Sequence, residues 1–380
     1  MKEAFILSAK RTPIGSFSGA LASYTAPQLG AKAIAAAVEA AGMKPEDVSE
    51  VIMGNVVSAG IGQAPARQAA IGAGIPVSVG ATTVNKVCGS GLKAVMMGCQ
   101  SILLGESDVV VAGGMESMSK TPFLLDKARS GYRLGHGKLV DSVIHDGLWD
   151  PYKDVHMGIC GEVCSEEERI SRQQQDEYAV ASYKSAQKAQ AEGAFAEEMF
   201  TFDGILEDEE PKKARLEKIG RLRPAFKKDG TITAANASKL NDGAAAVVLA
   251  SAEKAEGKRP LAKVVGWATF AQEPERFTTA PAGAIKKVLE KAGWKPEDVD
   301  LYEINEAFAV VALAVMKLVG IPREKVNVNG GAVALGHPIG ASGARILATL
   351  VHALAKRGLK RGVAAICLGG GEAVAVAVER

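Results

Sequence analysis

Residues 41–48 read Ala-Gly-Met-Lys-Pro-Glu-Asp-Val, and residues 292–299 read Ala-Gly-Trp-Lys-Pro-Glu-Asp-Val. Each copy follows an alanine- and lysine-rich stretch of helical character and precedes a strand-like run, at residues 51–53 and 301–304. Self-similarity at a long, fixed spacing is the signature of a duplicated structural unit. The repeat therefore predicts two halves that are built alike from helices and strands.

The register of the repeat continues toward the C-terminus. Residues 88–93 align with residues 340–345, and residues 109–114 align with residues 364–370. Apolar residues at helical spacing follow the first aligned pair, which predicts a helix there in each half. Three runs are almost entirely apolar, as strands buried on both faces are: residues 51–56, 108–112 and 363–368, with Asn55 and Asp108 as the polar exceptions. Packing two such halves together predicts an α/β fold of five layers: helices, sheet, helices, sheet, helices.

The first half is interrupted by a segment of different texture. Its strand pattern stops after Gly114 and resumes at residues 244–249, the counterpart of residues 372–378. The segment between is polar, is broken by Gly and Pro, and has one clear helix pattern after Ser171. We therefore expect a lid or loop domain inserted in the first half. The expected divisions are residues 1–117 with 241–258 for the N-terminal half, 118–240 for the inserted domain and 259–380 for the C-terminal half.

A basic cluster lies inside this expected insertion. Residues 212–228 hold eight basic side chains directly after the acidic run at 207–210. Such a pattern is typical of a solvated charged face. The alternative interpretation is a site for a polyphosphate ligand.

Composition excludes several classes of partner. The chain has 380 residues and a net charge of +2, which gives no reason to expect a nucleic acid or an anionic membrane as partner. The longest purely apolar run, residues 307–316, is too short to span a bilayer. Five cysteines without a disulfide-like spacing indicate a reducing compartment. With a start that lacks the features of a leader peptide, these observations predict a soluble, cytoplasmic protein.

Cys88 is the first candidate for catalysis. It lies between the β-branched run at residues 82–84 and a helix pattern that ends at Gly105. A strand, a tight turn and a helix would place its sulfur at a helix N-terminus, where a thiol pKa falls below its usual value of about 8.5. Gly89 and Gly91 would leave room for a substrate beside it. The alternative interpretation is a small buried cysteine of structural role only.

Three further stretches end or begin elements where the same pocket would lie. Asn305 follows the strand-like run 301–304, although it would also serve as a helix cap. His337 stands between two glycines and before Pro338, which holds its backbone extended. Cys367 ends an apolar strand and is followed by glycines at residues 369–371, whose N–H groups are suited to binding an oxyanion. We expect these residues to converge with Cys88, because ligands in α/β folds bind at strand ends.

Together these blocks resemble the signature motifs of the thiolases. The matching blocks are Arg11-Thr12-Pro13-Ile14-Gly15, Asn85-x-x-Cys88-x-Ser90-Gly91, Asn236-Ala237-Ser238, Asn241-Asp242-Gly243, Asn305-Glu306-Ala307-Phe308, Gly336-His337-Pro338-x-Gly340-x-Ser342-Gly343-Ala344-Arg345 and Cys367-x-Gly369-Gly370-Gly371. They follow the family order from about residue 10 to the C-terminus. The resemblance implies the five-layer fold with an inserted loop domain that binds coenzyme A.

The resemblance also implies a reaction and a role for each candidate residue. The reaction is the reversible Claisen condensation of two acetyl-CoA molecules to acetoacetyl-CoA and CoA. Cys88 would carry the acyl group and His337 would activate it. Cys367 would remove the α-proton of the second acyl-CoA, while His337 and a water held by Asn305 stabilise the enolate. The N–H groups of Cys88 and Gly369 would bind the thioester oxyanion.

Residues that contact the acyl group and CoA are implied in the same way. The block His156-Met157-Gly158 resembles that of short-chain members, in which the Met side chain walls the acyl pocket; without the resemblance Met157 would be taken as core filling. The implied substrate contacts are His156, Met157, Lys212, Phe226, Ala234, Ser238, Phe277 and Phe308. The chain departs from the family pattern at Lys239, where small or polar residues are usual.

The resemblance implies no cofactor other than the CoA substrates, no metal, and a homo-oligomer, either a dimer or a tetramer, in lipid metabolism. Three alternatives stay open. A degradative thiolase of longer chain length would share the catalytic residues, and a non-catalytic CoA-binding protein would need none of them. A metal or redox protein using Cys160, Cys164 and His156 is a further alternative, although on a helix the two cysteines fit better as packed thiols. A ketoacyl-carrier-protein synthase would need a second histidine, and Asn305 and Cys367 argue against it.

Overall fold

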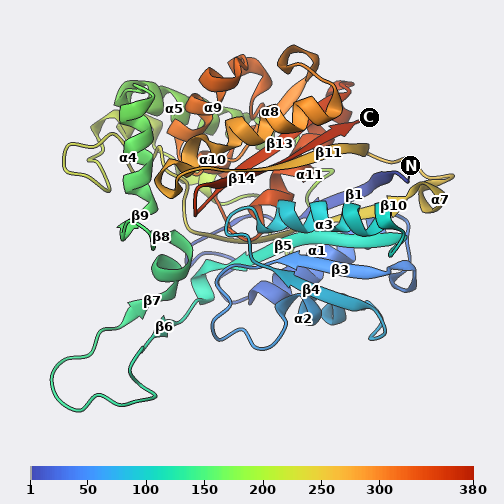
Figure 1. The fold of residues 1–380 in the computed structure, drawn as a ribbon, viewed down its shortest axis with the longest axis horizontal. Coiled ribbons are helices and arrows are strands. Elements are labelled where there is room, and N and C mark those ends of the chain that lie inside the picture. The colour runs from blue at the N-terminus through green and yellow to red at the C-terminus, as the bar shows by residue number, and fades with distance from the viewer. Residues whose placement is uncertain (1) are drawn as a thin grey trace.

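The central sheet consists of two half-sheets with the same strand arrangement, which are joined where an edge strand of one pairs with an edge strand of the other. The structure, a computed structural model, describes residues 2–380 (Figure 1). The N-terminal half-sheet consists of β1 (Ala4–Arg11), β10 (Asn241–Ser251), β5 (Val109–Ser117), β3 (Glu50–Gly54) and β4 (Gly80–Val84), with the short β2 (Gly15–Ser16) beside β10. The C-terminal half-sheet consists of β11 (Ala262–Ala271), β14 (Glu372–Glu379), β13 (Arg361–Leu368) and β12 (Leu301–Ile304). Phe5 and Ile6 of β1 pair with Lys263 and Ala262 of β11, which joins the halves.

Strand order and direction repeat between the halves, so the predicted duplication is confirmed. β3 runs parallel to β5, as β12 runs parallel to β13. β10 is antiparallel to β5, as β14 is antiparallel to β13. Even the position of β4 has a counterpart, because Val326 forms a parallel bridge with Tyr302 of β12.

The repeated Lys-Pro-Glu-Asp sequence folds identically in both copies. It forms the 3₁₀ turns η1 (Pro45–Asp47) and η6 (Pro296–Asp298). In each turn the Asp carboxylate accepts a hydrogen bond of 2.8 Å from the backbone N–H of the Lys three residues earlier, Lys44 or Lys295. The turn delivers the chain into β3 or β12, so a local hydrogen bond starts the equivalent strand in each half.

The helices form three layers around the two half-sheets, as predicted. The pairs, in order through the molecule, are α1 (Ala26–Ala40) with α2 (Pro65–Gly72), α3 (Ser90–Leu104) with α11 (Ser342–Arg357), and α8 (Ala280–Ala292) with α9 (Ala309–Val319). α3 and α11 share one hydrophobic cluster with strands of both half-sheets, whereas α1 and α8 lie in separate clusters on the outer faces. Each large apolar side chain buried in these layers contributes about 1.5–3 kcal/mol.

α3 and α11, the equivalent helices of the repeat, touch at their equivalent glycines. A side chain on Gly91 would lie 2.8 Å from the backbone N of Ala344, and one on Gly343 would overlap the backbone of Leu92. The expectation that Gly91 admits substrate is therefore wrong. This glycine lets two helix backbones approach closely at the centre of the molecule.

Between β5 and β10 the chain leaves the sheet for residues 118–240. This part contains η2 (Met118–Lys120), β6 (Phe123–Leu124), β7 (Val140–Asp141), η3 (Val143–Leu148), β8 (Trp149–Asp150), β9 (Val155–His156), α4 (Met157–Glu167), α5 (Arg172–Ala191), α6 (Glu210–Lys213) and η4 (Leu216–Arg221). The predicted helix after Ser171 is α5, which begins with a reciprocal Ser171–Gln174 capping box. The segment between β6 and β7 projects as a finger from the body (Figure 1).

The remaining short elements are α7 (Ala252–Ala255), η5 (Pro274–Thr279), η7 (Arg323–Lys325) and α10 (Ala332–Leu335). One stretch, Val87–Leu104, is long and apolar enough to cross a membrane by composition. More than half of it is buried between the two half-sheets, as expected of a core helix.

Candidate active site

Cys88 lies in a strained turn between β4 and α3. The preceding residue, Val87, has a φ of +46°, a left-handed conformation that is unfavourable for a β-branched side chain. Among the short-range hydrogen bonds that hold the turn, the N–H of Val87 donates to Asn85 Oδ1 (3.0 Å) and the N–H of Lys86 donates to Ser90 Oγ (2.9 Å). Strain of this kind costs about 1–3 kcal/mol and persists where the surroundings enforce it.

The electrostatics of Cys88 differ from the sequence-based expectation. Its side chain packs against the cluster that contains Val56, Val57 and Ile339, and this burial raises the thiol pKa to about 12. The N–H groups of Cys88 and Gly369 are directed at the sulfur and act in the opposite direction. The prediction of a lowered pKa in the free protein is therefore wrong, because desolvation outweighs the donors. A base beside this thiol would therefore favour its ionisation.

Gly89 has a packing role as well. A side chain there would lie 2.5 Å from Cδ2 of Leu368, at the end of β13. Thus the missing side chain brings the Cys88 turn against the strand that carries Cys367, rather than opening a path for substrate.

His337 lies between α10 and α11, and its imidazole has one defined tautomer. Nδ1 lies 2.6 Å from Oγ of Ser342, and that hydroxyl donates its own hydrogen to the carbonyl of Pro338 (2.9 Å). Ser342 must therefore accept from Nδ1–H, which leaves the lone pair on Nε2. The backbone N–H of His337 donates to Asn241 Oδ1 (2.9 Å) and fixes the loop. Burial, with a contribution from Arg345, lowers the imidazole pKa to about 3, so the ring is a neutral base.

Asn305 faces the histidine rather than capping a helix. Its Nδ2 lies 3.4 Å from Nε2 of His337. α9 begins four residues later, with Phe308 in the cap position, so the cap alternative is wrong. Among residues 2–380 nothing hydrogen-bonds to Oδ1 of Asn305, although the atom is buried. A buried amide oxygen of this kind is suited to binding a water or a substrate group.

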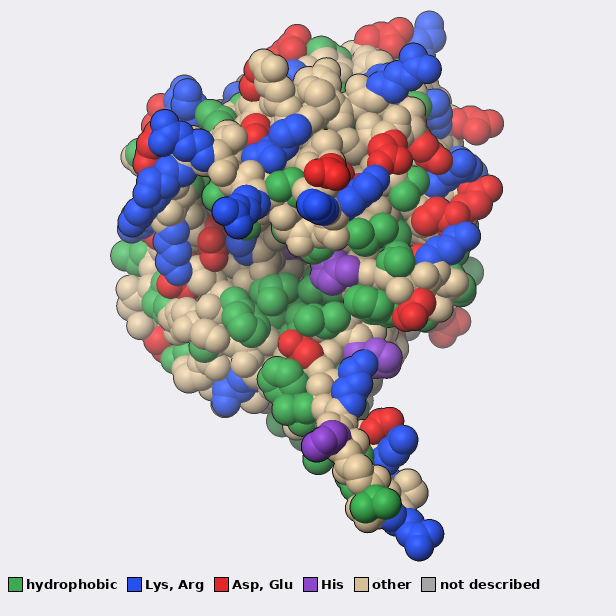
Figure 2. Space-filling model, turned by 90° about the vertical axis from the view of Figure 1, so that its left-hand side faces the viewer, with side chains coloured by type: hydrophobic (Ala, Val, Ile, Leu, Met, Phe, Trp, Pro, Cys, Tyr) green, Lys and Arg blue, Asp and Glu red, His purple; other side chains and the backbone are tan. Residues whose placement is uncertain are grey.

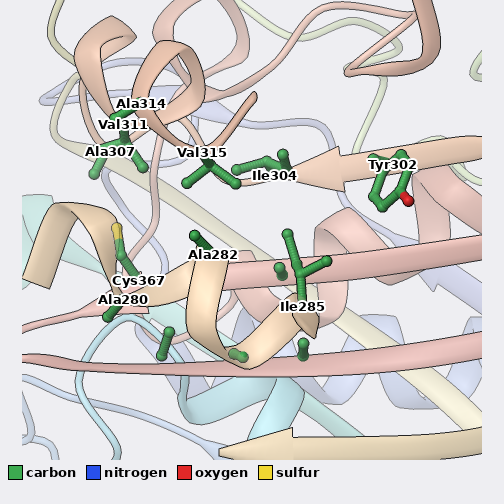
Figure 3. Close-up of a cluster of buried hydrophobic side chains, with 14 of the residues drawn as sticks. Ala280, Ala282, Ile285, Tyr302, Ile304, Ala307, Val311, Ala314, Val315 and Cys367 are labelled. Carbon is green, nitrogen blue, oxygen red and sulfur yellow. The ribbon is translucent and has the colours of Figure 1, made fainter. Parts of the chain in front are cut away.

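Cys367 is the last residue but one of β13 and approaches the same place from the C-terminal half. It is fully buried, in the cluster with Ala280 and Ala307, as Figure 3 shows. Burial raises its pKa well above the usual value, and the charge of an ionised Cys88 raises it further. The two sulfurs therefore influence one another's ionisation. After Cys367 the chain turns through Gly370 and Gly371, at φ of 89° and 84°.

One wall of the site is built around the start of α4. His156 caps this helix through Nδ1, which accepts from the N–H of Gly158 (3.0 Å), and its ring stacks on Phe226 with centroids 4.7 Å apart. Phe226 meets Phe308 edge-on at 6.1 Å. A side chain on Gly369 would lie 3.6 Å from Cε of Met157, so the methionine lies beside the loop that faces Cys88. The structure thus brings these predicted contacts together.

The other predicted contacts are more scattered. Ala234 is exposed, and Ser238 is half-buried with its N–H bonded to the carbonyl of Ala307 (3.0 Å). Phe277 is only 3% exposed and packs in the core cluster with Met157, so it supports the wall from behind. Lys212 is exposed on α6 and forms an ion pair with Glu207. The molecular face drawn in Figure 2 is hollowed, with hydrophobic side chains in the hollow and Lys and Arg gathered along one edge.

The departure at Lys239 has a local explanation. Its ammonium donates to the hydroxyl of Tyr183 (2.5 Å) and to the carbonyls of Ala237 and Val333 (2.9 Å each). Burial lowers its pKa to about 8. The side chain thus ties the segment that carries Ala234 and Ser238 to α5 and α10.

Sequence reasoning missed one buried carboxyl group next to the site. Glu116 of β5 accepts from Asn55 Nδ2 (2.9 Å), from the N–H of Val56 (3.0 Å) and from the N–H of Gly340 (3.0 Å). Burial raises its pKa to about 8. It fastens the loop after β3 to the loop of His337. The signal was a lone acidic residue in an otherwise apolar strand.

All five cysteines are free, and Cys160 and Cys164 are buried on α4. Within residues 2–380 no group of three or more His, Cys, Asp or Glu side chains is placed to hold a metal ion. The Cys88 sulfur faces the N–H groups of Cys88 and Gly369, its charge acts on Cys367, and it packs against the cluster that includes Ile339, on the loop that carries His337.

Fold and site together define a duplicated α/β protein with a cysteine-centred site where its halves meet. The chain belongs to the thiolase family: residues 4–253 match the thiolase N-terminal domain and residues 258–380 match the thiolase C-terminal domain. An acetyl-CoA acetyltransferase of Schizosaccharomyces pombe is 52% identical, with 100% of this chain and 99% of the relative covered. A Gibberella zeae protein named a cytosolic acetyl-CoA acetyltransferase is 54% identical, with 99% and 98% covered. The crystal structure of Acat5 thiolase from Ascaris suum in complex with coenzyme A matches at a TM-score of 0.96 and 47% identity, over 100% of both chains.

Proposed function

We propose that this protein is an acetyl-CoA C-acetyltransferase, which condenses two acetyl-CoA molecules to acetoacetyl-CoA and CoA and catalyses the reverse cleavage. The observation that carries the proposal is the surroundings of Cys88: the N–H groups of Cys88 and Gly369 face its sulfur, and its charge acts on a second cysteine at 367. The cluster against which Cys88 packs includes Ile339, on the loop of His337, whose Nε2 lone pair supplies the base. The names of the relatives agree with this activity.

In the first stage His337 takes the proton of the Cys88 thiol on Nε2. The sulfur attacks the carbonyl carbon of acetyl-CoA, and the N–H groups of Cys88 and Gly369 stabilise the oxyanion. The carbon–sulfur bond to CoA then breaks, and CoA leaves with the proton from His337. The low pKa of the imidazole favours the return of that proton.

In the second stage Cys367 gives its thiol proton to Nε2 of His337, and the resulting thiolate takes a proton from the methyl carbon of a second acetyl-CoA. The negative charge moves to the thioester oxygen, where the Nε2–H of His337 and a water held by Asn305 stabilise it. The carbanion forms a carbon–carbon bond with the acyl carbon on Cys88. As the acyl–sulfur bond breaks, the Cys88 sulfur takes the proton from His337, which leaves both thiols and the neutral imidazole as they were at the start.

For the acyl chain we propose a short length, with Met157 as the wall. Its contact with the Gly369 loop supports this placement, since a longer acyl group would have to displace the side chain. The inserted segment, residues 118–240, with Phe226, Ala234, Ser238 and the basic cluster, is proposed to bind CoA, without a further cofactor. A degradative thiolase of longer chain length is the alternative.

We further propose a cytoplasmic homo-oligomer, either a dimer or a tetramer, that serves lipid metabolism. Apolar side chains on the finger support the assembly, since Leu134 is 100% exposed and would be covered in an oligomer. The exposed edge of β4 supports it too, because an unpaired strand edge is a ready pairing surface. The cytosolic name of one relative and the five free cysteines support the location.

The test is CoA-dependent cleavage of 3-oxoacyl-CoA substrates from four carbons upward. We expect the highest rate at four carbons and no turnover in Cys88→Ser. In Met157→Ala the ratio of the six-carbon to the four-carbon rate should rise, because the wall is removed. A flat or rising profile in the wild type would favour the degradative alternative, and no cleavage at any length would favour a non-catalytic CoA-binding protein.

A further inference from the structure

An ion pair joins the two halves of the molecule beside the sulfur of Cys88. Nζ of Lys86 lies 2.5 Å from Oε2 of Glu372, and each side chain is 27% exposed. A half-buried pair is less screened by water than a surface pair and has a fixed geometry. Neither residue touches the reacting atoms in the mechanism above.

Each partner belongs to a turn that supplies one oxyanion donor. Lys86 stands two residues before Cys88, in the turn strained at Val87. Glu372 is the first residue of β14 and directly follows the glycine turn that begins at Gly369. The donor of the first turn is thus carried by the N-terminal half, and the donor of the second turn by the C-terminal half.

Few other polar contacts hold these turns together. Apart from the N–H of Gly369 directed at the Cys88 sulfur, the Lys86–Glu372 pair is the one side-chain hydrogen bond or ion pair between residues 85–90 and 369–372 in the described chain. The glycine turn is held on its other side, where the carbonyl of Gly371 accepts from the N–H of Gln272 (2.9 Å). Spacing between the turns therefore depends on the ion pair and on the packing of Gly89 against Leu368.

Spacing of this kind matters because oxyanion donors act only at hydrogen-bond distance from the developing charge. A shift of a few tenths of an ångström between the turns would move one donor relative to the other. We propose that Lys86 and Glu372 are positioning residues, a latch that sets the distance between the two donors. The proposal rests on the proposed function, because it assigns the latch to the acylation of Cys88.

The test compares Lys86→Met, Glu372→Gln and the charge-swapped double variant K86E/E372K. In either single variant we expect kcat to fall by about tenfold, less than the loss of a whole donor, with KM for the acyl-CoA within about twofold. The swapped pair should recover to within about threefold of the wild type, and Lys86→Arg should retain most of the activity. The burst of Cys88 acylation in a quenched single turnover should slow by the same factor as kcat.

A matched control is the ion pair between Lys263 and Glu3, which also joins the halves but lies along β1 and β11 (3.1 Å). Lys263→Met should leave kcat unchanged. The proposal is contradicted if both single variants keep wild-type kcat, or if the charge-swapped double variant is as slow as the single variants. If instead the proposed function were wrong, the wild-type protein itself would show no acylation of Cys88, so the two failures can be distinguished.

Discussion

The imidazole of His337 is held at both nitrogens, by Ser342 at Nδ1 and by Asn305 at Nε2. Because the Ser342 hydroxyl donates to Pro338, the proton of the neutral ring lies on Nδ1 and the lone pair lies on Nε2, which faces Asn305. A serine five residues after the histidine thus leaves Nε2 with the lone pair that the proposed role of His337 as a base requires.

Ser342→Ala should lower kcat by about 10- to 100-fold while the protein stays folded. The buried Nδ1–H loses its acceptor, which costs roughly 1–3 kcal/mol, and each 1.4 kcal/mol on the barrier is about tenfold in rate. The measurement is steady-state cleavage of acetoacetyl-CoA. Ser101→Ala, on the equivalent helix α3, is the control and should keep wild-type kcat; an unchanged kcat in Ser342→Ala would contradict the tautomer assignment.

The low pKa of His337 predicts a pH-dependent stability. In the folded chain this pKa is about 3, whereas in the unfolded chain it is about 6.5. Between these values the unfolded chain binds a proton that the folded chain does not, so the free energy of unfolding falls as pH falls from about 6.5 toward 3. In urea titrations His337→Asn should lose less stability over this window than the wild type, by up to about 1.4 kcal/mol per pH unit. Parallel pH profiles would refute the neutral buried ring.

At this scale the sequence identifies the candidate residues of the site but not their ionisation. Cys88, His337 and Cys367 stand out because each follows or precedes a glycine-rich turn at an element end. The thiol pKa depends instead on Val56, Val57 and Ile339, which reach Cys88 only after folding. The position of Cys88 before a helix therefore predicted a lowered thiol pKa, whereas burial in the folded chain raises that pKa.

At the scale of elements, the crossing of α3 and α11 holds the two halves in register. Gly91 and Gly343 are equivalent in the repeat, and each takes the place where a side chain would strike the other helix backbone. Both helices start at the site, α3 just after Cys88 and α11 five residues after His337. The distance between the helices therefore contributes to the distance between Cys88 and His337.

Gly343→Ala should lower the free energy of unfolding by about 1–3 kcal/mol or more, because an added carbon overlaps backbone that cannot rotate away. Denaturant titration measures the change, and kcat should fall with it. Gly220→Ala is the control, since nothing lies within 4 Å of the added carbon there. If Gly343→Ala proved as stable as the wild type, the close helix crossing would be disproved.

Most elements were predictable because their patterns are local. The repeated turn with its Asp cap, the apolar strands and the helix after Ser171 each follow from a few neighbouring residues. Interactions across the chain were not predictable in this way. The Asn305 cap alternative failed because α9 starts after Phe308, and Glu116 was missed because its partners come from two distant loops.

For the whole molecule, the duplication accounts for the two similar halves, whereas the residues of the candidate site differ between the halves. In the repeat, Cys88 of the first half corresponds to Gly340 of the second, so the fold holds one sulfur of this kind. His337, Asn305, Cys367 and Gly369 all come from the second half. Each half is therefore incomplete alone, and the site exists where β13, α3 and α11 meet.

The most direct measurement is mass spectrometry of the acid-quenched protein after mixing with acetyl-CoA. We expect one acetyl group on the peptide that contains Cys88 in the wild type, its accumulation in Cys367→Ser, where condensation cannot follow, and none in Cys88→Ser. An acetyl group on any other residue, or its persistence in Cys88→Ser, would contradict the account.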